Sequence, residues 1–296
     1  MQKIAAFIMS KRFIPVIILL TLGSLFIHFQ TQGKNESENT DNPKVRFAKI
    51  LKNVGILLEE GHFSPKKVDD LYSREVMKKF IGDLDDEKDI FLQSDIDGFK
   101  KYENRIDDEI HGADIESFFA VNEVYQKRFL EVSKYYTEIL SKPFNFNIDE
   151  RVMMDREKAS HPKTEAERYD LWRKRLKYGV LSRYADLLED REKNKDKKDF
   201  VVKADSTLER EARDQVRKQI ERYFNTRKNR ETVDENFSTF VNAITSVMDP
   251  HTDYFPPIDL RAFNESMSGR FFGIGAQLKE DDGKIKIASL VSGGPA

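Results

Sequence analysis

Apolar residues recur three and four positions apart along most of the chain between residues 43 and 248. This spacing places them on one face of a helix and predicts a series of amphipathic helices, about seven in all. Two of these helices are expected to start at Asn42-Pro43 and at Ser64-Pro65, because proline suits the first helical position. Another is expected at Ser94. No alternation typical of strands interrupts the region, which we therefore predict to be all-helical.

Capping boxes mark three further helix starts, at which serine or threonine is followed three positions later by glutamate. A longer amphipathic stretch precedes them, from Ile115 to Leu140. The charged run from Lys193 to Asp199 predicts a loop between two helices. It is a poor nucleic-acid patch, because acidic residues interrupt it and no aromatic residues are interleaved. The capping boxes are Thr164 with Glu167, Ser206 with Glu209, and Thr232 with Glu235.

The pattern changes after residue 248. Asp249-Pro250 interrupts the helical spacing, and two strand-like runs follow, Phe271 to Lys279 and Lys284 to Val291. The sequence between them predicts a tight turn. We therefore predict a domain boundary between 250 and 268, followed by a mixed or β-rich domain.

The stretch from Phe13 to Phe29 is apolar and follows the basic residues Lys3, Lys11 and Arg12. This arrangement predicts an exported chain whose basic flank stays in the cytoplasm. An uncleaved membrane anchor, a cleaved signal peptide and, least favoured, a buried core helix fit the pattern. No convincing small-residue cleavage site follows, which favours the anchor.

Composition excludes several classes of function. The 50 basic and 52 acidic residues give a net charge of -2, so no overall field attracts nucleic acid or anionic lipid. Cysteine is absent, which excludes disulfides, thiolate metal sites, cysteine nucleophiles and a lipid-modified cysteine. No Ser-His-Asp set and no phosphate-binding glycine-rich motif is recognisable.

The tetrapeptide Gly273-Ile274-Gly275-Ala276 is a candidate binding loop. Two glycines around one aliphatic residue allow a sharp turn that aims backbone N–H groups into a concavity suited to a carboxylate. A strand leaving such a loop offers an edge to which an extended peptide can add. A glycine-softened hairpin without a ligand is the alternative interpretation.

Two acidic patterns are candidate metal sites. Asp249, His251 and Asp253 would share one face of a strand. A helix-ending turn, in which these side chains cap local backbone, is favoured instead. The run from Asp83 to Asp89 fails the calcium-loop spacing, because Lys88 stands where glycine is needed, so we predict a solvated acidic loop. We predict no metal ion and no cofactor.

The segment Met248 to Tyr254, together with Gly273 to Ala276, two strands and Gly293 to Ala296, resembles the carboxy-terminal processing proteases, closest to their tail-specific protease branch. Phe91 to Asp95 resembles part of the helical head of that branch. The resemblance implies a mainly α fold with an N-terminal membrane helix, a large all-helical domain and the first strands of a truncated PDZ-like α+β domain. The implied domains are 1–30, a signal peptide or transmembrane anchor; 31–42, a flexible linker; 43–250, the helical N-terminal domain; 251–267, a connector; and 268–296, a partial PDZ domain.

The resemblance also assigns roles within the glycine loop. The loop starts at Gly273, and the N–H groups of Ile274, Gly275 and Ala276 would bind a peptide carboxylate. Ile274, Ala276 and Leu278 would line the pocket for the last side chain of the peptide.

The implied function is that of an exported serine endopeptidase that degrades or processes proteins from their C-terminal tails. Its serine nucleophile and lysine base are expected beyond this chain, so no catalytic residue is expected here. The expected partners are proteins or peptides with free C-termini, the membrane through the N-terminal helix, and an adaptor protein, but not nucleic acid. The expected location is the bacterial cell envelope, inner-membrane anchored or periplasmic. A non-catalytic tail-binding envelope protein is the main alternative, and a purely structural helical envelope protein is a weaker one.

Overall fold

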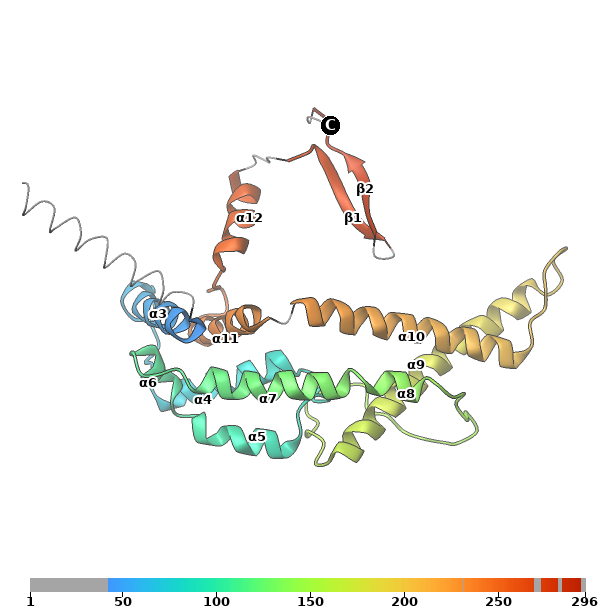
Figure 1. The fold of residues 1–296 in the computed structure, drawn as a ribbon, viewed down its shortest axis with the longest axis horizontal. Coiled ribbons are helices and arrows are strands. Elements are labelled where there is room, and N and C mark those ends of the chain that lie inside the picture. The colour runs from blue at the N-terminus through green and yellow to red at the C-terminus, as the bar shows by residue number, and fades with distance from the viewer. Residues whose placement is uncertain (1–41, 231, 269–272, 282–283, 294–296) are drawn as a thin grey trace, which may run out of the picture. The chain divides into compact units, whose positions relative to one another are not determined.

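The computed structural model describes residues 42–230, 232–268, 273–281 and 284–293 (Figure 1). The chain divides into two compact units, Met1–His251 and Thr252–Ala296. The predicted leader, 1–30, and nearly all of the predicted linker, 31–42, lie outside the described residues. Of the helices that are described, none combines the length and the apolar character needed to cross a bilayer. The predicted domain limits stay predictions.

Helices build the described part of the first unit, and a helix followed by a two-stranded sheet builds that of the second. The predicted mainly helical fold with strands near the C-terminal end is therefore confirmed. The elements are α3 (Pro43–Ile56), the π-helical turn η1 (Leu57–Gly61), α4 (Asp70–Leu84), α5 (Gln93–Phe99), the 3-10 turn η2 (Lys100–Tyr102), α6 (Ile106–Ile110), α7 (Ser117–Val132), α8 (Tyr135–Ile139), α9 (Glu165–Asn194), α10 (Asp205–Arg230), α11 (Val233–Met248), α12 (Pro257–Ser268), β1 (Ala276–Asp281) and β2 (Lys284–Leu290).

Side-chain caps fix several of the predicted helix starts. The Asn42 side chain accepts a hydrogen bond from the N–H of Lys44, and α3 begins at Pro43 as predicted. Thr164 caps α9 and Thr232 caps α11, each accepting from the N–H three residues later. Local hydrogen bonding at these positions therefore decides where the helix begins.

Three predicted starts are displaced. Ser94 lies inside α5, which begins at Gln93. Residues 65–68 are irregular, and α4 begins only at Asp70, because the Asp69 side chain accepts from the N–H groups of Leu71 and Tyr72. Ser206 lies inside α10, which begins at Asp205. The predicted continuous helix from Ile115 to Leu140 is broken between α7 and α8, and the predicted loop at Lys193 begins only after Asn194.

Stacked aromatic rings form the core between α3, α4, α7 and α11. The rings of Phe47 and Phe237 stack with their centroids 3.9 Å apart, and Phe118 packs edge-on to both. Phe80 of α4 meets Phe240 of α11 at 5.0 Å. These side chains are almost fully buried, so their apolar surface stabilises the packing of four helices that are distant in sequence.

Phe224 of α10 joins a second cluster. Its ring lies 5.6 Å from both Phe129 of α7 and Trp172 of α9, and 5.8 Å from Tyr136 of α8. Trp172 is only 6% exposed and belongs to this core. This second cluster holds the long α9 and α10 against the body of the helical unit (Figure 1).

Two helical glycines should respond in opposite ways to the same substitution. A Cβ added at buried Gly55 would overlap Cγ2 of Ile110 and lie 3.3 Å from its carbonyl oxygen, whereas a Cβ at Gly82 meets nothing within 4 Å. We expect Gly55→Ala to lower the free energy of unfolding by about 1–3 kcal/mol. Gly82→Ala should raise it by about 0.5–1 kcal/mol, because alanine is the better helix former. Urea unfolding measures both, and equal effects of the two variants would contradict the packing described here.

Candidate peptide-binding strand and the cleft of the helical unit

The two strands of the second unit pair antiparallel. Ala276 lies opposite Leu290, and Leu278 lies opposite Ile287. The register shifts between Gln277 and Leu278, so one extra residue of β2 stands opposite β1 as a bulge. Within the described residues the sheet has these two strands alone, so each has one unpaired edge. The predicted turn between them, at residues 282–283, lies outside the described residues.

The predicted glycine loop lies directly before β1. Gly275 has a φ of 70°, in the left-handed region that glycine adopts without strain. Its carbonyl oxygen accepts a hydrogen bond of 2.7 Å from the N–H of Val291, which ties the loop to the end of β2. β1 starts at Ala276 rather than near Phe271, since Gly273 to Gly275 form a bend. The assignment of a bound carboxylate to this loop stays a prediction.

One face of this sheet is apolar and uncovered within the second unit. The cross-strand pairs place the side chains of Leu278 and Ile287 on the same face, together with those of Ala276 and Leu290. Leu278 is 54% exposed, and Ile274 in the loop is 60% exposed. Of the three predicted pocket residues, Ile274 and Leu278 are therefore exposed and Ala276 is partly exposed.

The pattern of Asp249, His251 and Asp253 forms the predicted helix-ending turn. α11 ends at Met248, and the Asp249 side chain accepts a hydrogen bond of 2.7 Å from the N–H of His251. His251 and Asp253 are exposed. No group of three histidine or carboxylate side chains that could hold a metal ion exists among the residues that the structure describes.

The acidic run from Asp83 to Asp89 is not the solvated loop that we predict from its composition. Asp85 is 2% exposed and Asp89 is 5% exposed. The Asp85 carboxylate accepts from the backbone N–H groups of Asp89, Ile90 and Phe91, at 2.9, 3.1 and 2.8 Å. The loop folds around this one side chain because its buried backbone N–H groups would otherwise lack partners.

This loop presents two carbonyl groups to α9. The indole N–H of Trp172 donates to the carbonyl oxygen of Asp89 at 3.0 Å, and Arg168 donates to that of Ile90 at 2.6 Å. Arg168 is 0% exposed and also donates to Glu131 of α7, at 2.7 Å. A buried guanidinium is tolerated only when its donors are satisfied, so these bonds fix where α9 lies.

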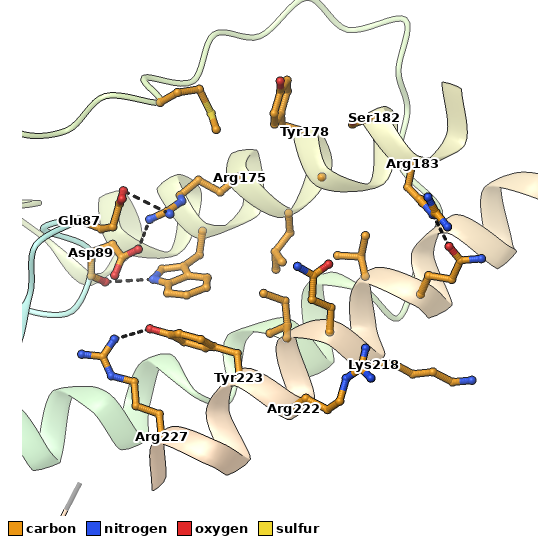
Figure 2. Close-up of a pocket in the computed structure, with 18 of the residues that line it drawn as sticks. Glu87, Asp89, Arg175, Tyr178, Ser182, Arg183, Lys218, Arg222, Tyr223 and Arg227 are labelled. Atoms are coloured by element: carbon orange, nitrogen blue, oxygen red, sulfur yellow. Dashed lines mark hydrogen bonds and ion pairs between the residues drawn. The ribbon is translucent and has the colours of Figure 1, made fainter. Parts of the chain in front are cut away.

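A cleft of about 930 Å³ opens between α9, α10 and this loop (Figure 2). Its walls include Trp172 and Gly179 on α9, and Val216 and Tyr223 on α10. Arg175 lies at one end, where it pairs with Glu87 at 3.3 Å and with Asp89, and stands over the indole ring of Trp172. Arg183 lies toward the other end, hydrogen-bonded to Gln215 of α10.

Burial sets the charge state of two groups beside the cleft. It raises the pKa of the Asp89 carboxyl to about 7, although the positive charge of Arg175 acts in the opposite direction. Burial, with the positive charges of Lys88 and Arg156, lowers the pKa of His161 to about 4. His161 is therefore neutral at pH 7, whereas Asp89 titrates close to that pH.

Residues 55–258 match the family described as the tail specific protease N-terminal domain. A tail-specific protease of Haemophilus influenzae is 33% identical over 240 residues, which are 81% of this chain and 32% of the relative. The chain belongs to the tail-specific protease family. The family resemblance found in the sequence is thereby confirmed.

Two relatives of other lineages match shorter segments. The carboxy-terminal processing protease CtpA of Bacillus subtilis is 43% identical over 53 residues, 18% of this chain and 11% of that protein. A probable CtpA-like serine protease of Staphylococcus saprophyticus is 30% identical over 96 residues, 31% of this chain and 19% of that protein. The chain thus spans about a third of the length of the Haemophilus relative, and less of the other two.

The match to the tail specific protease N-terminal domain family covers the cleft but not the glycine loop. Asp85, Trp172 and Tyr223 all lie within residues 55–258, whereas Gly273 to Ala276 lie beyond them. Sequence reasoning missed the cleft, because its lining comes from four separate segments of the chain. One signal in the sequence could have indicated the cleft. Trp172, Arg175 and Gly179 lie on one face of a predicted helix, and an isolated glycine inside a helix usually has a role in packing or binding.

Removing the buried guanidinium should destabilise this tail-specific protease domain. We expect Arg168→Met to lower the free energy of unfolding by about 3–5 kcal/mol, because Tyr135, Glu131 and the Ile90 carbonyl lose a donor. Arg105→Met is the control, because the ion pair between Arg105 and Glu116 is solvent-exposed. This variant should lower the free energy of unfolding by about 1 kcal/mol or less. Urea denaturation compares the two, and similar losses would refute the role given to Arg168.

The Asp89 carboxyl should make stability fall as pH rises from about 4 to about 7. Its pKa is about 7 in the folded state and 3.8 as the ordinary value, so folding takes up a proton within this window. Asp89→Asn cannot titrate. The stability of the variant relative to the natural protein should therefore increase from pH 4 to pH 7 and level off above it. Urea titrations at four pH values measure this difference, and a difference independent of pH would contradict the raised pKa.

Proposed function

We propose that this chain belongs to an exported serine-type endopeptidase that recognises protein substrates by their C-terminal tails. The observation that carries the proposal is the 33% identity with a tail-specific protease over 81% of the chain. In this proposal the chain supplies the helical domain and the first strands of a PDZ-like module. The serine nucleophile and its lysine base belong to a part of the enzyme outside these residues.

The contribution of the second unit is capture of the substrate tail. An extended peptide would add to the unpaired edge of β1 through backbone hydrogen bonds. Its terminal carboxylate would lie against the N–H groups of Ile274, Gly275 and Ala276. The left-handed backbone of Gly275 supports this role, because such a bend can direct successive N–H groups toward an anion.

The pocket for the last side chain would include Ile274, Ala276 and Leu278. Ile274 and Leu278 are accessible, and the small side chain of Ala276 leaves room between them. We propose that the protein works in the bacterial cell envelope, either anchored by its N-terminal segment or released into the periplasm. Its partners would be protein substrates with free C-termini and an adaptor protein.

The protein expressed from its complete gene provides the test. A fluorescent reporter protein with an apolar tail should be degraded when the tail carries a free carboxylate and at least about ten-fold more slowly when the tail is amidated. Serine-directed inhibition should abolish the degradation. Tail binding without any hydrolysis would favour the non-catalytic tail-binding alternative, and the absence of both would overturn the proposal.

A bulky side chain at Ala276 should narrow the pocket. In the same protein, Ala276→Trp is expected to weaken binding of tails ending in phenylalanine by about ten-fold, and to leave tails ending in alanine nearly unchanged. Retained binding of the alanine-ending tail would show that the variant is folded. Lys279→Trp is the matched control, because residue 279 is on the opposite face of β1. Fluorescence anisotropy measures the affinities, and unchanged binding of both tails by Ala276→Trp would exclude Ala276 from the pocket.

A further inference from the structure

The cleft of the helical unit is a groove between two long helices. The lining residues of α9 run from Trp172 to Asp186, and those of α10 run from Gln215 to Arg227. At 1.5 Å per residue, both helices follow the groove for about 20 Å. This length matches that of a helix of about four turns.

Large apolar side chains border the groove yet stay open to water. Met154 is 57% exposed, Tyr178 is 49% exposed and Tyr223 is 41% exposed. Beneath them, Trp172, Leu176 and Val216 form an apolar floor. Clustered exposed apolar surface of this kind marks a binding surface on a soluble protein.

Small residues at the middle of α9 allow a close approach. Gly179 lines the groove, and a Cβ built on it would come no nearer than 3.9 Å to Val216. Ser182 follows one turn later on the same wall. A helix can therefore approach α9 closely at this point, as small residues permit where two helices cross.

The charges at the two ends of the groove differ. At one end, Arg175 is already paired with Glu87 and Asp89. Toward the other end, Figure 2 shows Lys218, Arg222 and Arg183 along the walls. Among the ion pairs found in the described residues, none includes Lys218, and Arg183 pairs with Asp186 at 3.6 Å. The Lys218 ammonium group leaves a positive charge at this end that is complementary to acidic side chains on an occupant.

We propose that this groove binds one amphipathic helix of a protein partner, about four turns long, with its apolar stripe on Trp172 and Gly179 and its acidic side chains toward Lys218 and Arg222. A helix suits the groove better than an extended peptide, because the walls are helices whose backbone groups are already hydrogen-bonded and leave no strand edge to extend. The site is separate in sequence from the glycine loop and does not depend on its function.

Trp172 makes the test direct, because it is the only tryptophan of the chain. The probes are three amidated peptides of about 14 residues without tryptophan. One carries a leucine stripe and an acidic face, the second the same stripe and a basic face, and the third the acidic composition in scrambled order. Amidation keeps the probes from acting as free C-terminal tails, so failure here is distinct from failure of the proposed protease function.

The acidic amphipathic peptide should change the fluorescence of Trp172 in the full chain, saturably and with a Kd in the micromolar range. The basic peptide should bind at least about ten-fold more weakly, and the scrambled peptide should not saturate. In the double variant Lys218→Glu and Arg222→Glu, this preference should reverse. Equal binding of the three peptides, or no binding, would overturn the proposal.

Substitutions at Gly179 provide the matched pair. Gly179→Leu fills the groove and should weaken binding of the acidic peptide by at least about ten-fold, whereas Gly179→Ala adds one methyl group that makes only an ordinary contact with Val216, at 3.9 Å, and should keep the affinity within about three-fold. Circular dichroism shows that both variants are helical. Equal affinities of the two variants would place the peptide elsewhere. The fluorescence of Trp172 could instead change with the concentration of the chain in the absence of peptide, and sedimentation could detect dimers. Together these results would show that the groove binds a second copy of the chain, and they would also overturn the proposal.

Discussion

The buried guanidinium of Arg168 is the constraint on which the helical unit depends. It joins α9 to the loop after α4 through the carbonyl of Ile90, and to α7 through Glu131. A charge with no exposure to water must keep these partners, so α9 has little freedom to move relative to either element. The direction of α9 then decides where α10 packs and where the groove between them opens.

Asp85 makes that arrangement possible. Its carboxylate gathers three backbone N–H groups of the loop and turns the carbonyls of Asp89 and Ile90 toward α9. Burial raises the pKa of Asp85, and the backbone hydrogen bonds partly offset this. An acidic run thus acts as an internal scaffold, because a short carboxylate side chain can satisfy several neighbouring N–H groups at once.

The two candidate sites of this tail-specific protease chain expose apolar surface in different settings. On the sheet, Leu278 and Ile287 lie on one uncovered face of a two-stranded ribbon, which has too little surface to bury its own side chains. In the groove, Tyr178 of α9 and Tyr223 of α10 line the two walls and are 49% and 41% exposed. The first suits an extended chain, and the second suits a helix.

Features that depend on neighbouring residues could be predicted from the order of amino acids, whereas those that join distant segments could not. Helices at Pro43, Glu165 and Val233, the turn at Asp249 and the left-handed Gly275 follow from side chains and backbone angles within a few residues of one another. Family membership followed from short motifs of the same local kind. The proposed pocket around Ala276 also depends on residues adjacent in sequence, so the same motifs were enough to suggest it.

The burial of Asp85, the partners of Arg168 and the groove beside Trp172 arise only when the chain is packed. The partners of Arg168 lie 33 to 78 positions away in the chain, and the hydrogen bond from Arg227 to the Leu84 carbonyl spans 143 positions. An acidic residue in a polar run looks solvated in the sequence, because composition records hydration preference but not the backbone groups that folding brings to it. Burying the backbone N–H groups of this loop without hydrogen-bond partners would cost free energy, and this cost exists only in the folded chain. It therefore favours the arrangement in which the Asp85 carboxylate accepts from them.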